Sequence, residues 1–248
     1  NLSEMIWSCI HEGGHALYEQ GILSENYGTP LGNSVSLGIH ESQSRLWENH
    51  VGRSLEYWQN NYATLQSLFP EKLKDIDYNK FYQATNNVKP SLIRTNADEL
   101  TYHLHVLIRY EIEKGLIEGS IKVKDLPSIW NEKYYSYLGV KVPNDSNGVL
   151  QDIHWSHGSF GYFPTYTIGS FYAAQFFNKA SIDINDIDKK ILNGDTTELL
   201  KWLRDNIHQH GEKYDAKVLC KRITGEELNF KYFMDYVTKK YSAIYNLS

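Results

Sequence analysis

The most restrictive feature of the sequence is a pair of histidines, His11 and His15, four positions apart in a segment that is apolar at helical spacing. Residues i and i+4 of an α-helix lie on one face, so two imidazoles at this spacing can bind the same metal ion. We therefore predict a helix over residues 3–20, ended by Gly21, with a metal site on one face. The alternative is a helix that carries two surface histidines and an unrelated acidic residue.

Glu12 lies between the two histidines and adds a catalytic element to the motif. In metalloproteases, two histidines at this spacing hold zinc, and the glutamate between them polarises the water that attacks the peptide bond. The side chain of Glu12 is expected to point beside the ion rather than at it. The pattern thus predicts a zinc-dependent hydrolase in which Glu12 is the general base.

A third ligand is expected downstream, because a catalytic zinc normally takes three protein ligands and keeps one position open for water. Glu41 is the best candidate, since a helix–loop–helix hairpin can return it from the start of a second predicted helix to the first. The other candidates are His40, Glu25, Glu48 and Glu19. His40 is expected to face elsewhere on its helix, Glu25 lies in the loop, and Glu48 lies two turns further on.

The rest of the chain also reads mainly as helix, and its strand patterns are weak and short. The exception is a stretch rich in Gly, Pro and Asn over residues 139–164, which we interpret as an ordered loop or short-strand region that carries functional residues. A chain of 248 residues suits one large domain or two small ones, and we treat residues 1–248 as one catalytic zinc-binding region. The further predicted helices span residues 39–68, 96–118, 126–138, 167–179, 184–192, 197–208 and 226–245.

Charge and hydropathy argue against several classes of partner. The net charge of −5 gives no general support for binding to nucleic acid or to an anionic membrane. No apolar run approaches transmembrane length and no signal peptide is visible, so we expect a cytoplasmic protein. The chain opens without methionine and enters a helical pattern almost at once. We therefore expect it to be a piece of a longer protein.

Four segments, taken together and in this order, resemble the carboxypeptidase Taq family of zinc metallocarboxypeptidases. They are HEGGHALYEQG, GIHESQSRLWENHVGRS, IRTNADELTYHLHVLIRYEIE and GVLQDIHWSHGSFGYFPTYTIGSFYAAQ. The resemblance runs from about Met5 to the C-terminus and is far more specific than the two histidines alone. It implies that the third zinc ligand is the glutamate of the His-Glu-Ser segment, here Glu41. Cobalt or manganese are alternatives to zinc at the same ligands.

The resemblance also implies a fold and a size. The family fold resembles neurolysin and the angiotensin-converting enzymes, with two helical lobes beside a deep groove, and its members tend to form homodimers. This chain matches the C-terminal half of family members and would supply the zinc and one groove wall. Two segments normally found upstream, Asp-x-Arg-x-Thr and His-Pro-Phe, are missing. The alternatives to a carboxypeptidase are an inactive structural fragment and a zinc oligopeptidase of related fold.

Peptide hydrolysis also needs a donor for the oxyanion and a proton for the leaving amine. Glu12 is expected to return the proton after acting as base. His157 and Tyr166 are the predicted oxyanion donors, since their Gly-rich stretch is similar to the His…Tyr…Tyr region of neurolysin-type peptidases. Tyr162, in the same stretch, is a predicted substrate contact. For each tyrosine, packing of a loop against the core is an equally good interpretation.

A carboxypeptidase must recognise the free C-terminus of its peptide substrate, and a guanidinium binds a carboxylate well through two charge-assisted hydrogen bonds. Arg94 is the first choice for this role, and the resemblance supports it. The alternative is an ion pair between Arg94 and Asp98 that caps the next helix. Gln151 and His154 are predicted to line the groove, and Asp152 either orients a neighbouring histidine or forms a turn.

Two other histidine pairs look structural. His103 and His105 are two positions apart on a predicted helix, so they cannot share a metal ion. His208 and His210 lie near the end of a predicted helix and have no acidic or cysteine companion at useful spacing. We interpret them as residues of a solvated helix end.

Overall fold

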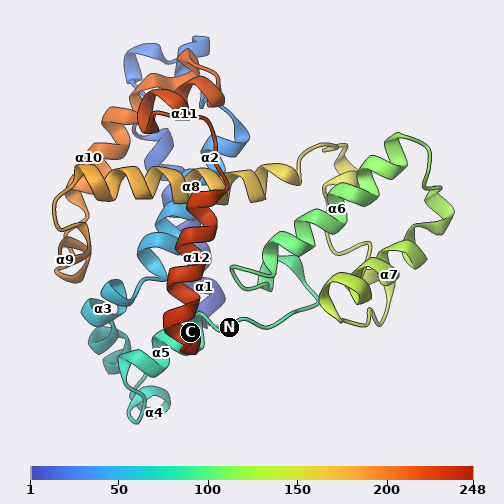
Figure 1. Cartoon of the computed structure of the whole chain (residues 1–248), viewed down its shortest axis with the longest axis horizontal. Coiled ribbons are helices and arrows are strands. Elements are labelled where there is room, and N and C mark those ends of the chain that lie inside the picture. Colours follow the sequence, from blue (N-terminus) through green and yellow to red (C-terminus); the bar gives the residue numbers. More distant parts are fainter. Residues whose placement is uncertain (1, 248) are drawn as a thin grey trace. The chain divides into compact units, whose positions relative to one another are not determined.

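The computed structural model describes residues 2–247 and is built almost entirely from helices (Figure 1). No β-strand occurs within these residues, which confirms the predicted mainly α class. None of the described helices is long and apolar enough to cross a membrane. The α-helices are α1 (Leu2–Glu19), α2 (Leu37–Arg45), α3 (Leu55–Leu68), α4 (Pro70–Leu73), α5 (Tyr78–Thr85), α6 (Tyr102–Ile117), α7 (Leu126–Leu138), α8 (Pro164–Asp183), α9 (Ile187–Leu192), α10 (Thr197–Asn206), α11 (Ala216–Thr224) and α12 (Lys231–Tyr245).

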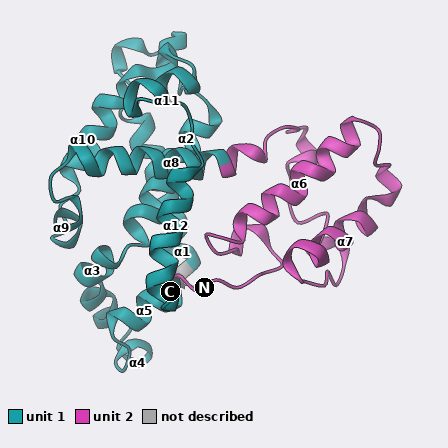
Figure 2. Cartoon of the chain, viewed as in Figure 1, with its two compact units in different colours: residues 1–85, 168–248 teal, residues 86–167 magenta. Residues whose placement is uncertain are grey.

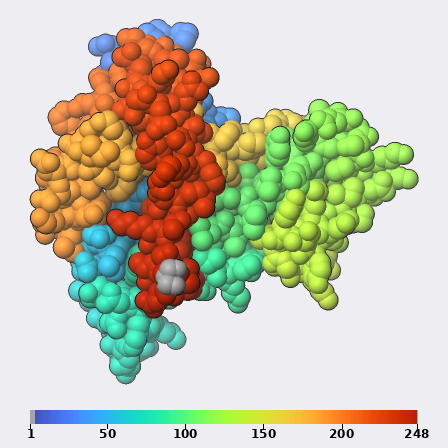
Figure 3. Space-filling view, viewed as in Figure 1, coloured from blue at the N-terminus to red at the C-terminus, as the bar shows by residue number. Residues whose placement is uncertain are grey.

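The chain forms two compact units, and the second is inserted into the sequence of the first (Figure 2). Unit 1 comprises residues 1–85 and 168–248, and unit 2 comprises residues 86–167. In unit 1, apolar side chains of α1, α2, α8, α10 and α11 form the main core. The C-terminal helix α12 covers part of unit 1 and contributes to its surface (Figure 3). In unit 2, α6 and α7 pack around buried Ile108 and Trp130.

Within unit 1, α2 and the π-helical segment that follows it, η3 (Leu46–Gly52), are buried on almost every side. Their apolar residues, among them Ile39 and Leu46, belong to the core. Two carboxylates on the same segments, Glu41 and Glu48, are also buried. A buried carboxylate needs a positive partner, hydrogen bonds or a metal ion, because the loss of hydration is otherwise too costly. These two side chains therefore identify a candidate functional site in unit 1.

The prediction of one helix over residues 39–68 is wrong, because two helices replace it. α2 passes into η3, and the chain leaves helical geometry at Ser54, whose φ and ψ angles are −77° and 158°. The Ser54 hydroxyl accepts a hydrogen bond from the backbone of Tyr57 and so caps the N-terminus of α3. Apolar residues continue through the break at nearly helical spacing. The sequence pattern therefore gives no sign that the helix is interrupted.

The helix predicted over residues 96–118 begins later, at Tyr102. The Asp98 carboxylate accepts hydrogen bonds from the backbone of Leu100 and Thr101, and it thereby holds a turn in front of α6. The loop predicted over residues 139–164 lacks strands and contains only short 3-10 turns before α8 begins. The interpretation as a loop is confirmed, and the alternative of short strands is wrong.

The prediction that His208 belongs to a solvated helix end is wrong, because its side chain is completely buried. Its Nε2 atom lies 2.9 Å from Oε1 of Gln43 on α2, and its ring packs against Tyr18 on α1. Gly21 approaches the same ring so closely that a β-carbon there would lie 2.4 Å from its Nδ1 atom. His208 thus connects the C-terminal part of unit 1 to α1 and α2, the helices that carry the two histidines and Glu41.

We expect His208 to make unit 1 less stable in acid. Burial, with smaller effects of Arg204 and His40, lowers the pKa of His208 to about 3, whereas an unfolded histidine titrates near pH ~6.5. The unfolded chain then binds more protons as the pH falls from about 6.5 toward 3, so the free energy of unfolding falls with it. In chemical denaturation at several pH values, the free energy of unfolding of His208→Gln should depend less steeply on pH than that of the unchanged chain. Equal slopes for both proteins would contradict the assignment.

Candidate metal centre

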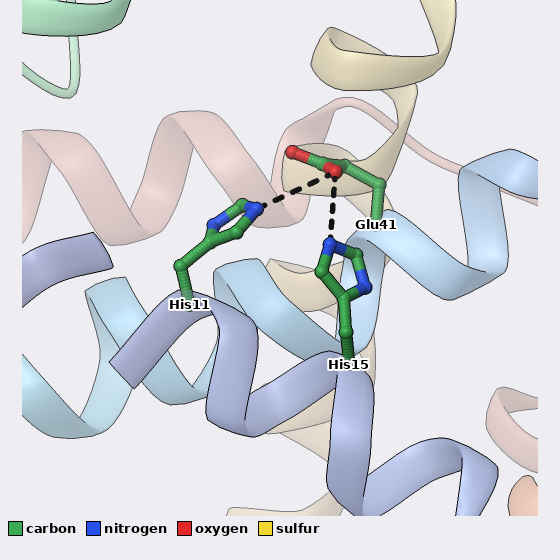
Figure 4. A group of neighbouring side chains, drawn as sticks. All are labelled: His11, His15 and Glu41. Carbon is green, nitrogen blue, oxygen red and sulfur yellow. Dashed lines mark ion pairs between the residues drawn. The ribbon is translucent and has the colours of Figure 1, made fainter. Parts of the chain in front are cut away.

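α1 and α2 bring three metal-binding side chains together (Figure 4). The Nε2 atoms of His11 and His15 lie 3.8 Å and 3.6 Å from Oε2 of Glu41. One donor atom from each residue falls within 4.8 Å of the other two. A tetrahedral ion about 2.1 Å from each donor spaces the donors roughly 3.4 Å apart, so the observed distances fit one small divalent metal ion.

Two glycines allow this close approach. A β-carbon at Gly14 on α1 would lie 2.6 Å from Cα of Ser44 on α2, which is closer than real contacts permit. A β-carbon at Gly169 on α8 would lie 2.5 Å from Cγ of Glu41. Gly13, in contrast, has no neighbouring atom within 4 Å of such a position. The motif between the two histidines therefore needs only its second glycine for packing.

The carboxylate of Glu41 is held so that one oxygen faces the histidines. Its Oε1 atom accepts a hydrogen bond of 2.8 Å from Nε of Arg45, and its Oε2 atom faces His11 and His15. Arg45 and Arg53 also pair with Glu48 at 3.2 Å and 3.0 Å. Glu48 was a rival for the third ligand, but its carboxylate binds Nδ1 of His11, at 3.0 Å, on the far side of the ring from Glu41.

Burial raises the pKa of Glu48, but the charges of Arg45 and Arg53 and the hydrogen bond to His11 outweigh this effect and lower it well below its usual range. Glu48 is therefore ionised at neutral pH. A carboxylate on the second nitrogen of a metal-binding histidine fixes the ring orientation and raises the basicity of the ligand. Glu48 occupies that position for His11.

His15 is also prepared for metal binding. Burial, together with nearby His11 and His40, lowers the pKa of His15 to about 4. Its imidazole is therefore neutral near pH 7, which is the form that binds metals. His40 does not face elsewhere, as the sequence suggested, because its Nδ1 atom lies 2.5 Å from Nδ1 of His15.

Glu12 is exposed on α1, one residue beyond His11. The described part of the chain offers its carboxylate neither a hydrogen bond nor an ion pair, so this group is free to bind a water molecule. A general base must lie within hydrogen-bond reach of the water that it activates. Glu12 lies on the helix that carries both histidines, and its carboxylate, unpaired within the described residues, has the chemistry that this role requires.

The predicted residues of unit 2 form a buried polar network. Nε and Nη2 of Arg94 donate to Oδ1 of Asp152 at 2.9 Å and 2.7 Å, and Nη1 donates to the Tyr102 hydroxyl at 3.0 Å. Arg109 donates to Oδ2 of Asp152 at 2.6 Å and to Oε1 of Gln151 at 2.9 Å. The alternative of an Arg94–Asp98 pair is wrong, since Asp152 takes that place. Two guanidinium groups therefore share the carboxylate of Asp152.

His154 and Tyr166 form a second pair in unit 2. The Nε2 atom of His154 lies 2.9 Å from the Tyr166 hydroxyl, and the ring of Tyr162 packs against His154. Burial and Arg94 lower the pKa of His154. His157, which the sequence predicts as an oxyanion donor together with Tyr166, is exposed and contacts Ser159. The structure thus brings His154 rather than His157 to the Tyr166 hydroxyl.

The comparison with known families is decisive. The family profile described as "Carboxypeptidase Taq (M32) metallopeptidase" matches residues 1–241. The chain belongs to the carboxypeptidase Taq family. The resemblance noted in the four motifs is therefore confirmed, and the chain is part of a metallocarboxypeptidase family. Membership implies a divalent metal, and the donors of His11, His15 and Glu41 fit one.

Curated relatives and solved structures agree with this assignment. Thermostable carboxypeptidase 1 of Thermus thermophilus is 48% identical over 97% of the chain, and Carboxypeptidase 1 of Bacillus subtilis is 46% identical over 98%. The chain covers 47% and 48% of these relatives. It superimposes on the M32 carboxypeptidase of Deinococcus radiodurans R1 with a TM-score of 0.94 at 42% identity, covering 97% of this chain and 49% of that one. The chain spans about half the length of the relatives that it matches.

Two residues outside the predicted set, Arg109 and Glu113, hold these carboxypeptidase Taq motifs in place. Arg109 is completely buried on α6 and shares Asp152 with Arg94. Glu113, one turn further along α6, accepts hydrogen bonds from Nε1 of Trp155, at 2.8 Å, and from the backbone of Gly161. It thereby fixes both ends of the loop that carries His157. Both residues lie in the third quoted motif at a spacing of four, which was the available signal.

Proposed function

We propose that the chain is the metal-binding part of a zinc metallocarboxypeptidase that removes C-terminal residues from peptides. The observation that carries this proposal is the convergence of His11, His15 and Glu41, with the free carboxylate of Glu12 on the same helix. A hydrolase needs both a metal with an open position and a base beside it. The family fold would then resemble neurolysin and the angiotensin-converting enzymes, and the longer protein would complete a groove for the peptide.

The chemical roles follow from the groups. When bound at His11, His15 and Glu41, zinc would supply a Lewis acid that polarises the scissile carbonyl and lowers the pKa of water. Glu12 would accept the proton of the attacking water and pass it to the leaving amine. Glu48 would keep His11 oriented throughout.

His157 and Tyr166 stay our predicted donors to the oxyanion. The hydrogen bond between Tyr166 and His154 supports the tyrosine, since it holds the hydroxyl in one position. His154, Tyr162 and Gln151 are the proposed contacts for the peptide substrate.

Recognition of the substrate is proposed to use the two buried guanidinium groups of unit 2. Arg94 and Arg109 share the single carboxylate of Asp152, and both guanidinium groups are buried. A terminal carboxylate would accept charge-assisted hydrogen bonds from a guanidinium group, and this favours a peptide with a free C-terminus over an amidated one. Asp152 holds the fork of Arg94 in a fixed direction, which lowers the entropic cost of binding. A cytoplasmic location and a homodimer of the longer protein remain predictions.

We expect the purified chain to bind about one zinc ion. His11→Ala, His15→Ala and Glu41→Gln should each lower the affinity for zinc by more than roughly 100-fold. This loss is larger than the loss caused by changing an outer-shell group. Zinc content after dialysis, followed by competition with a chromophoric chelator, measures this. His210→Ala removes a histidine outside the site and serves as the control. Zinc binding that survives in the three site variants would reject the proposed centre.

A further inference from the structure

His40 has no role in the ligand set, yet it makes a close contact with that set. It precedes Glu41 on α2, and its ring is turned toward α1. Its Nδ1 atom lies 2.5 Å from Nδ1 of His15, and its Nε2 atom lies 2.8 Å from Oε1 of Glu19. The three side chains form a continuous row of hydrogen bonds. The row ends at the Nε2 atom of His15, which faces Glu41 at 3.6 Å.

When both imidazoles are neutral, the contacts in this row determine where each proton lies. The Glu19 carboxylate can only accept a hydrogen bond, so Nε2 of His40 must carry the proton. The Nδ1 atom of a neutral His40 is then an acceptor, and Nδ1 of His15 must be the donor. That leaves a lone pair on Nε2 of His15, the nitrogen that faces Glu41. The opposite order would place an imidazole lone pair against the carboxylate of Glu19.

We propose that His40 is a positioning residue that fixes the tautomer and the ring orientation of His15. Glu19 determines which nitrogen of His40 donates its hydrogen bond and which accepts one. This rests on the proposed metal site. The two histidine ligands are then held differently: His11 has the carboxylate of Glu48 directly behind it, whereas His15 has a neutral imidazole between itself and a carboxylate. The second carboxylate is also half-exposed, whereas Glu48 is buried.

The first experiment tests the proton positions without metal. In the zinc-free chain, ¹⁵N–¹H long-range NMR spectra of the imidazole rings should show the Nδ1–H tautomer for His15 and the Nε2–H tautomer for His40. A purely structural role of His40 in packing would not predict this pair of tautomers. An Nδ1–H tautomer at His40 would overturn the proposal, whatever the affinity of the site for zinc.

The second experiment measures zinc affinity by chelator competition. His40→Ala should weaken zinc binding by about 10–100-fold, as expected for the loss of an outer-shell partner. His40→Gln should restore most of the affinity, because its amide offers an acceptor to His15 and a donor to Glu19. Circular dichroism of the zinc-free variants establishes that each has folded.

The outcomes separate this proposal from the proposed function. Unchanged affinity in His40→Ala, or equal losses in the Ala and Gln variants, would reject the role of His40 while the metal centre stands. If the unchanged chain bound no zinc, the metal centre would fail, and the tautomers of the zinc-free chain would still decide whether His40 and Glu19 orient His15.

Discussion

Gly14→Ala should weaken zinc binding by roughly 10-fold or more, a loss comparable to that of an outer-shell partner, whereas Gly13→Ala should leave it unchanged. The added methyl group at Gly14 would lie 2.6 Å from Cα of Ser44, and backbone atoms cannot yield as a flexible side chain can. α2 must then move away from α1 and take Glu41 with it. Overpacking of this kind costs about 1–3 kcal/mol of stability, which would exceed the gain of ~1 kcal/mol from replacing glycine in a helix.

Gly13→Ala is the matched control because it makes the same chemical change in the same turn of α1. No atom lies within 4 Å of the position that its methyl group would take. The free energy of unfolding should therefore rise by up to about 1 kcal/mol through helix propensity alone. Denaturant unfolding and chelator competition on both variants make the comparison. If the two substitutions had the same effect on zinc affinity, close packing of the helices would not be what holds the site together.

Glu12→Gln should reduce peptide hydrolysis by about 10²–10⁴-fold, the usual contribution of general acid–base catalysis, and leave the metal in place. The substitution keeps the shape of the side chain but removes its ability to take a proton. Glu12 has no partner within the described residues, so neither the fold nor the ligands depend on it. The effect should appear in kcat, measured on a preparation that hydrolyses peptides.

Zinc content measured on the same samples separates loss of the base from loss of the metal. A Glu12→Gln protein that retains its zinc and hydrolyses peptides at the original rate would remove Glu12 from the mechanism. Cleavage of peptides with free and with amidated C-termini, assayed together, would at the same time test the predicted preference for a carboxylate.

The convergence of His11, His15 and Glu41 could be predicted because it depends on local geometry. His11 and His15 share a helix face at a spacing that any α-helix provides, and Glu41 follows one loop later at the start of the next helix. The mainly helical class was accessible for the same reason, since periodicity repeats along most of the chain. α11 also carried local signals, with Asp215 at its N-terminus and Gly225 at its C-terminus, but these were overlooked.

The burial of His208 and the pairing of Arg94 depend on contacts between residues that are distant in the sequence. Local sequence patterns do not reveal such contacts. The ring of His208 is buried because Gly21 and Gln43 meet it, and neither is near it in the sequence. Arg94 pairs with Asp152 rather than with its neighbour Asp98 because the fold of unit 2 brings that carboxylate to it. Propensity and spacing rank partners by proximity along the chain, so they favoured the wrong one.

The insertion of unit 2 into unit 1 also sets an order of events during synthesis. All three proposed ligands precede unit 2 in the chain, whereas Gly169, which faces Glu41, and His208, which holds Gln43, follow it. A growing polypeptide therefore exposes its ligands to the cell long before it contains the residues that support them. Contacts between segments so far apart in the sequence form slowly. We therefore expect stable capture of the metal to be a late, post-translational step, and a nascent chain to hold its histidines in no fixed geometry until then.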